Sequence, residues 1–138
     1  MEGTWIEIGV TVNADLEKVW NAWTTPEHIM NWNFASDDWH CPAATNDVRK
    51  GGSFSSTMAS KDGKMSFEFG GVYSDVKPLQ LIQYALGDGR KVEVWFKETP
   101  DGVELKESFQ AEGTNSDEMQ KSGWQAILEN FKKYTESL

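Results

Sequence analysis

The sequence has 138 residues and a formal net charge of −9 at pH 7. This length fits one domain, residues 1–138, with a core of its own. The charge disfavours binding to nucleic acids and anionic membranes, because these polyanions repel an acidic protein. A single cysteine, Cys41, excludes an intramolecular disulfide bond.

The N-terminal residues contain neither the basic nor the apolar segment of a secretory signal. No stretch approaches the roughly 20 apolar residues of a membrane-spanning helix. We therefore expect a cytoplasmic protein that does not insert into membranes. No sequence motif indicates a cofactor.

Residues 6–12 alternate between apolar and other residues, which predicts a strand with one buried face. Apolar residues within 16–23 then follow a helical period, which predicts a short amphipathic helix with Asn13 or Asp15 as its cap. Thr25 as cap and Pro26 at the first helical position predict a second short helix.

Residues 33–47 show no hydrophobic period and are expected to form a long loop over one end of the domain. Residues 48–109 alternate in short runs separated by turn sequences, which predicts successive antiparallel strands, about six in all. Gly70 and Gly71 interrupt one of these runs and indicate a bulge or sharp bend. Residues 116–137 are expected to form the longest helix.

Five of the seven tryptophans lie within the first 39 residues. Each tryptophan buries a large ring and carries one N–H group that needs an acceptor. Such crowding predicts an aromatic wall, which belongs either to a packed core or to a pocket.

Several spaced motifs occur together along the chain. They are Val19-Trp20-x-x-Trp23-Thr-x-Pro26-Glu27-His28-Ile29-x-x-Trp32, Asp38-Trp39-His40-Cys41-Pro42, Gly51-Gly52, Gly71-x-Tyr73 and Gly123-Trp124-x-x-Ile127-Leu128-x-Asn130-Phe131. With the element order, these motifs resemble the START-like or SRPBCC superfamily, and within it the chain is similar to homologues of the activator of heat-shock-protein-90 ATPase. The resemblance implies an α+β helix-grip fold, in which a curved antiparallel sheet of about seven strands wraps around a long C-terminal helix, with two short helices after the first strand.

The superfamily holds apolar ligands in a cavity between sheet and helix, so the resemblance implies a binding or carrier protein for an apolar or aromatic small molecule. Two alternatives remain open: an enzyme of the aromatase or cyclase kind, and a protein-binding module related to chaperone ATPase activation and the stress response. We expect a monomer or a weak dimer.

Twelve side chains are expected to point inward and to contact the ligand, although each could instead be ordinary core. Gly123 would open room beside Trp124, or let the helix approach the sheet. The twelve are Trp32, Trp39, His40, Phe54, Met58, Phe67, Phe69, Tyr84, Glu107, Trp124, Ile127 and Phe131.

Glu107 lies in the inward phase of its strand, where a charge without a partner is costly. If it is buried, its pKa is raised; a bulge that turns it outward is the alternative. An enzyme would use Glu107 with Tyr84, His40 or Asp38.

His40 and Cys41 invite a metal or nucleophile hypothesis, but the ligand spacing of known zinc sites is missing. A cysteine–histidine dyad would need an activated thiolate and a third, orienting group. We therefore expect neither a metal site nor covalent catalysis, and assign His40 and Asp38 to hydrogen bonds within the loop.

Overall fold

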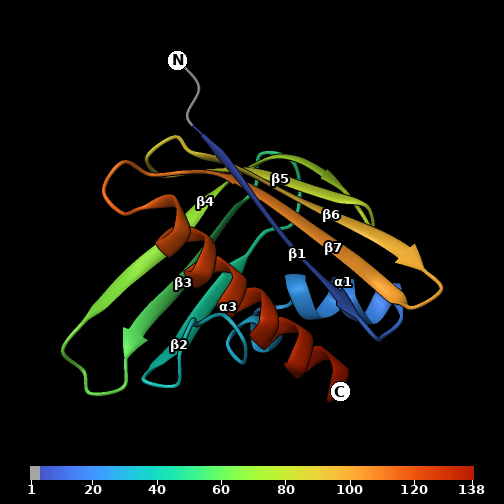
Figure 1. The fold of residues 1–138 in the computed structure, drawn as a ribbon, viewed down its shortest axis with the longest axis horizontal. Helices are drawn as coiled ribbons and strands as arrows, with labels where there is room; N and C mark the ends of the chain where they lie inside the picture. Colours follow the sequence, from blue (N-terminus) through green and yellow to red (C-terminus); the bar gives the residue numbers. More distant parts are fainter. Residues whose placement is uncertain (1–3) are drawn as a thin grey trace.

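The computed structural model describes residues 4–138. Residues 1–3, which belong to the segment judged to be no secretory signal, lie outside the described residues. Within the described chain, no helix has the length and apolar character needed to cross a membrane. The elements are β1 (Trp5–Val12), α1 (Leu16–Thr24), α2 (Pro26–Ile29), β2 (Trp39–Asn46), β3 (Ser53–Ser60), β4 (Ser66–Lys77), β5 (Leu81–Leu86), β6 (Lys91–Thr99), β7 (Gly102–Gln110) and α3 (Asp117–Glu136) (Figure 1).

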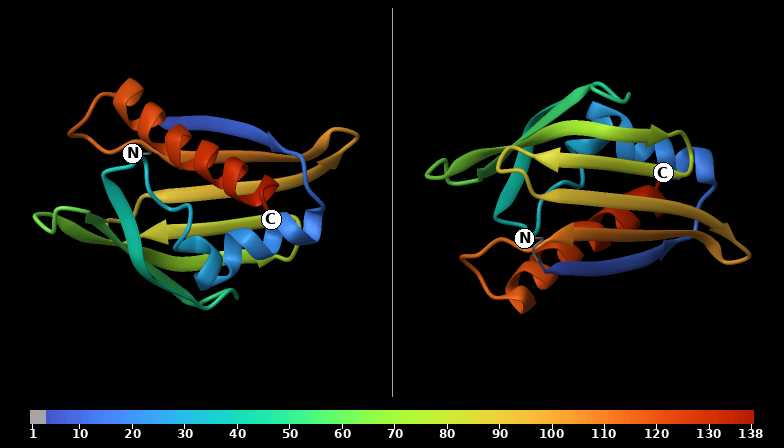
Figure 2. Two further views of the ribbon diagram at one scale, coloured as in Figure 1. Left: turned by 90° about the horizontal axis from the view of Figure 1, so that it is seen from below. Right: turned by 90° about the horizontal axis from the view of Figure 1, so that it is seen from above.

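The strands of residues 4–138 form one seven-stranded antiparallel sheet in the order β1-β7-β6-β5-β4-β3-β2. The sheet curls around α3, which crosses its concave side, while α1 lies beside the C-terminal end of α3 (Figures 1 and 2). The predicted α+β helix-grip fold, with two short helices after the first strand, is confirmed.

The core lies between the concave face of the sheet and the apolar face of α3. Along β1 the alternation predicted from the sequence buries Ile6, Ile8 and Val12. Leu128 and Phe131 of α3 are almost fully buried against this face. Burial of this apolar surface is the main force that holds helix and sheet together.

The N-termini of the helices lie at residues of the capping type. Asp15 and Thr25 occupy the N-cap positions of α1 and α2, although neither side chain makes a capping hydrogen bond. At the start of α3, the Ser116 hydroxyl accepts a hydrogen bond from the backbone N–H of Met119, which satisfies one donor of the first turn.

The predicted loop over residues 33–47 is wrong, because residues 39–46 form the edge strand β2, paired with β3. The pairing register shifts between His40 and Ala43, and Pro42 sits within this bulge. Proline has no N–H to donate to a sheet, so an edge strand with a bulge is one of the few strand settings that accept it. The bulge and two alanines removed the alternation on which the prediction relied.

Of the bulge or sharp bend predicted at Gly70 and Gly71, the bulge is wrong. Strand β4 continues through both residues, and its register shift lies between Tyr73 and Asp75. A Cβ atom on Gly71 would lie only 2.3 Å from the carbonyl oxygen of Ala85 on β5. Glycine is needed here because the neighbouring backbone comes too close for a side chain.

Candidate functional site

A cavity of about 410 Å³ lies between the concave face of the sheet and α3. Its volume falls within the roughly 300–1,000 Å³ of typical small-molecule pockets. Most of its wall is aromatic or aliphatic. It is lined by Trp23, Ile29, Trp32, Asn33, Thr45, Asn46, Phe54, Ser56, Met58, Phe67, Phe69, Tyr73, Ile82, Tyr84, Arg90, Glu107, Glu112, Asn115, Met119, Gln120, Gly123, Trp124, Ile127 and Leu128.

Most of the side chains predicted from the sequence meet at this cavity. These are Trp32, Phe54, Met58, Phe67, Phe69, Tyr84, Glu107, Trp124 and Ile127. Three others lie outside its lining: Phe131 is fully buried, Trp39 is half-buried beside Phe67, and His40 is exposed. That any of the twelve contacts a ligand remains a prediction.

Aromatic rings from sheet and helix support one another along the wall. Phe54 and Tyr84 meet edge to face, with ring centroids 4.8 Å apart. Trp124 of α3 stacks on Phe109 of β7, with centroids 4.0 Å apart and planes inclined by 9°. Such contacts add to the burial energy and fix the ring orientations, so this part of the wall is pre-formed.

Two rings that line the cavity, Trp23 and Trp32, pack against Phe131 of α3, which lies outside the lining. Trp23, Trp32 and Phe131 lie pairwise with centroids 4.9 Å apart. The Trp32 indole donates a hydrogen bond of 2.9 Å to the carbonyl oxygen of Ala22, which satisfies its one polar atom. Trp23 and Trp32 therefore serve as packed core on one side and as pocket wall on the other.

Gly123 provides space within the cavity. A Cβ atom built on it would have no atom within 4 Å outside its own helix backbone and its chain neighbours, and the residue lines the cavity. Of the two explanations for a glycine inside a helix, the structure supports room beside Trp124 rather than close approach to the sheet.

Glu107 points inward from β7, since the pairing of β7 with both β1 and β6 runs through it without a bulge. It is only 5% exposed, and burial raises the pKa of its carboxyl group to about 8. Among residues 4–138, the carboxyl group has neither a hydrogen-bond donor nor an ion-pair partner. Of the two orientations left open by the sequence, the structure has the inward one, and the carboxyl group lies at the cavity surface.

Two tyrosines add polar atoms to the wall. Burial, reinforced by the nearby Glu107, holds the pKa of Tyr84 well above its ordinary value. Burial also raises the pKa of Tyr73 to about 12, and its hydroxyl donates a hydrogen bond to the side-chain oxygen of Asn46. Asn46 in turn donates to the carbonyl oxygen of Thr24, so this part of the polar lining is satisfied within the protein.

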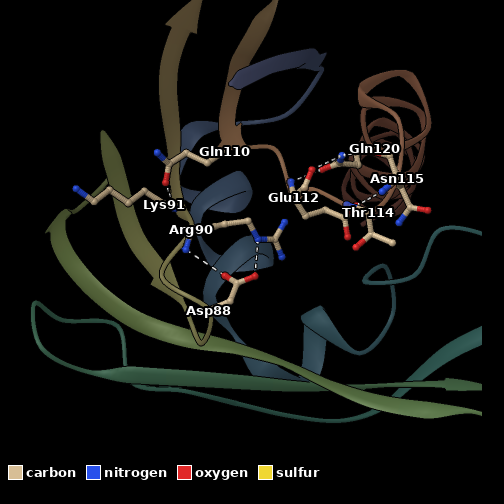
Figure 3. Close-up of polar contacts among 8 residues, drawn as sticks. All are labelled: Asp88, Arg90, Lys91, Gln110, Glu112, Thr114, Asn115 and Gln120. Carbon is tan, nitrogen blue, oxygen red and sulfur yellow. Dashed lines mark hydrogen bonds and ion pairs between the residues drawn. The ribbon is translucent and has the colours of Figure 1, made fainter. Parts of the chain in front are cut away.

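Exposed and polar side chains border the cavity near the start of α3. Phe67 and Met119 line it while 53% and 65% exposed. Arg90 comes from the turn between β5 and β6, whereas Glu112 and Gln120 come from the β7–α3 connection and the first turns of α3 (Figure 3). The Gln120 side chain bonds both the N–H and the carbonyl oxygen of Glu112, which fixes this border.

Sequence reasoning missed Arg90, Glu112, Met119, Gln120 and Asn46, whereas Phe67 was among the twelve predicted side chains. Asn46 was hidden because β2 was not recognised as a strand. Arg90 and Glu112 stand in or beside turns, where solvated charge is ordinary, so no sequence signal separates them from other surface charges.

The His40–Cys41 pair shows no reactive arrangement. Cys41 is buried, its thiol donates to the carbonyl oxygen of Ala43 at 3.4 Å, and burial raises the pKa of the thiol. A thiol held protonated is a poor nucleophile and metal ligand. Within residues 4–138, His, Cys, Asp and Glu side chains nowhere form a group of three that could hold a metal ion.

A family model described as "Activator of Hsp90 ATPase homolog 1-like protein" matches residues 13–136. No curated protein matches the chain.

Solved structures give close matches. The solution structure of the AHSA1-like protein from Aeromonas hydrophila has a TM-score of 0.92 at 39% identity, over 97% of this chain and 93% of that one. A solution structure from Cytophaga hutchinsonii has a TM-score of 0.82 at 57% identity, over 96% and 92% of the two chains. A crystal structure from Chromobacterium violaceum, with a TM-score of 0.86 at 20% identity over 96% and 98%, shares the fold.

Proposed function

The chain belongs to the family of Activator of Hsp90 ATPase homolog 1-like proteins, and from this premise we propose that it binds or carries an apolar or aromatic small molecule between the sheet and α3. One observation carries the proposal: a cavity of about 410 Å³ whose wall is mostly aromatic and aliphatic. An apolar ligand that fills such a space moves from water into an apolar environment. This transfer contributes roughly 25 cal/mol to the binding free energy for each Å² of apolar surface buried.

The geometry of the polar groups fits binding better than chemistry. Of the four residues considered for an enzyme, Asp38 and His40 are exposed and outside the cavity, which leaves Glu107 and Tyr84. At neutral pH the Tyr84 phenol carries its proton, and burial, which raises the pKa of the Glu107 carboxyl group to about 8, keeps most of that group protonated, so both are proton donors rather than bases. Chaperone binding has the family relationship in its favour, but no feature of this cavity supports it.

Native mass spectrometry of the protein purified from cells tests the proposal. We expect a discrete excess mass that disappears on denaturation, as for a non-covalent cargo. Gly123→Leu should lower the bound fraction, because its side chain enters the cavity. Ser122→Leu is the matched control, since Ser122 is the preceding residue of α3 and is exposed outside the cavity.

A thermal-shift screen with fatty acids, sterols, flavonoids and aromatic polyketides completes the test. A saturating ligand stabilises the folded state by RT ln(1 + [L]/Kd), which is about 2.7 kcal/mol at a hundredfold excess over Kd. A clean mass without cargo, combined with no thermal shift for any compound, would contradict the proposal.

A further inference from the structure

Glu107 is a polar group that the fold leaves without a partner. The other titratable or charged side chains that line the cavity are Tyr73 and Tyr84 from the sheet, and Arg90 and Glu112 at the border. Arg90 pairs through its Nε atom with Asp88 at 2.7 Å. No lysine or histidine lines the cavity, and no ion pair reaches Glu107 among residues 4–138.

The elements packed around Glu107 add no further charge. Its neighbours across β1 and β6 are Ile8 and Val94, both buried and apolar. On α3, the rings and aliphatic chains of Trp124, Ile127 and Leu128 face the cavity. Burying a carboxyl group in such surroundings costs free energy unless a counter-charge or a hydrogen-bond partner is supplied.

We propose that the ligand carries an organic ammonium group on an aromatic or apolar body, and that Glu107 is the anion that pairs with this group inside the cavity. The inference rests on the proposed small-molecule binding function and specifies the chemical class of the ligand.

The walls of the cavity suit a cation. The faces of tryptophan, tyrosine and phenylalanine rings attract ammonium groups, and the attraction increases where water is excluded. Trp23, Trp32, Phe54, Tyr84 and Trp124 bring such rings to one cavity. The charged residues of its border are Glu112 and Arg90, and the Arg90 side chain is already paired with Asp88, so the lining offers an anion no unpaired cation.

The net charge of the protein also favours a cationic ligand. A protein with a net charge of −9 attracts cations from solution and repels carboxylates. An ammonium group bound to the Glu107 carboxylate forms a charge-assisted hydrogen bond, the stronger kind. A neutral alcohol or ketone would gain only the weaker bond that a protonated carboxyl group donates.

The two ligand classes differ in how their affinity depends on pH. Because the carboxyl group is protonated below about pH 8, an ammonium ligand must displace a proton when it binds. Its affinity should therefore rise about tenfold per pH unit up to that point, since only the ionised fraction is competent to bind. The affinity of a neutral acceptor should stay constant below that pH and fall above it.

Titrations followed by amide NMR spectra test the inference with three probes of one shape: naphthylethylamine, naphthylethanol and naphthylacetic acid. At neutral pH we expect the amine to bind more tightly than the other two probes. Its affinity should rise about tenfold per pH unit between about pH 6 and pH 8. Glu107→Gln should weaken the amine about tenfold or more and abolish this rise, while leaving the affinity for naphthylethanol unchanged.

Glu112→Gln is the matched control, because it removes an acid at the border but keeps an oxygen that can accept the Asn115 N–H. The Glu112→Gln variant should retain the pH dependence of amine binding.

Amide spectra of both variants should show the wild-type fold. Tighter binding of the alcohol or the acid, or amine binding that is independent of pH, would overturn the ammonium inference and leave the proposed function intact. Failure of all three probes to bind would also overturn the ammonium inference, whereas the proposed function is decided separately by the native mass spectra and the thermal-shift screen.

Discussion

The protonation of Glu107 links the cavity to the stability of the fold. Burial raises the pKa of its carboxyl group from the ordinary 4.5 to about 8, so between these values the folded protein holds a proton that the unfolded chain releases. The stability that depends on this group is complete below about pH 4.5. It is lost progressively as the pH rises to about 8 and then stays constant.

We expect Glu107→Gln to remove this dependence, because an amide stays neutral. The variant should gain stability over the wild type by roughly 1.4 kcal/mol per pH unit between the two pKa values. Urea unfolding of both proteins at a series of pH values measures the difference. The same substitution at Glu104, on the opposite face of β7, serves as control. A difference that does not change with pH would contradict the prediction.

Trp32 provides a second test, because its indole N–H joins the segment after α2 to the end of α1. Trp32→Phe keeps a ring in the cluster but leaves the carbonyl oxygen of Ala22 without this donor. We expect a loss of about 1–3 kcal/mol in the free energy of unfolding. Trp95→Phe should change it by less than about 0.5 kcal/mol, since Trp95 is 47% exposed. Equal effects of the two substitutions in thermal unfolding would be inconsistent with the role of Trp32.

Strands and helices could be predicted wherever one periodic pattern dominates. The alternation in β1 and in β3–β7, together with Thr25 as a helix cap, predicts most of the elements. Strand β2 could not be found, because Pro42 and the bulge break its alternation and its pairing with β3 depends on the rest of the sheet. Pairing partners are a tertiary property that a short irregular segment does not encode locally.

Two glycines should respond in opposite directions to the same substitution. Gly123→Ala in α3 should gain about 0.5–1 kcal/mol, because alanine favours a helix and its Cβ atom meets open space. Gly71→Ala in β4 should destabilise the fold, because its Cβ atom would press on the carbonyl oxygen of Ala85. Denaturant unfolding of both variants measures the pair. Stabilisation by both would show that β4 and β5 are less closely packed than described.

The whole molecule is an incompletely closed half-barrel. Helix α3 packs against β1 and α1, whereas the cavity lies between it and strands β3 and β4, where Trp124 and Phe69 make a ring contact. The resemblance to a helix-grip family predicted this architecture and many of the residues on the wall. It could not separate Phe54, which lines the cavity, from Phe131, which is buried outside it, because that depends on how side chains pack in three dimensions.

This asymmetry predicts uneven hydrogen exchange across the sheet. Amides of β6 and β7 should exchange slowly, since both strands are paired on two sides and, unlike β2–β4, carry fully buried side chains. Amides of β2–β4 should exchange faster and should slow when a ligand fills the cavity. Hydrogen-exchange mass spectrometry with and without naphthylethylamine measures both effects. Uniform protection by the ligand, or the same slowing in Gly123→Leu, would contradict the expectation.

The pairing of the first strand with the last also determines when the chain can fold. Trp5 lies opposite Gln110, so β1 can enter the sheet only after nearly the whole sequence is available. At synthesis rates of about 5–20 residues per second, β1 leaves the ribosome several seconds before β7 exists. Such long-range closure slows folding, and the Ile6–Ile8 face stays open to chaperones or to other nascent chains during that interval.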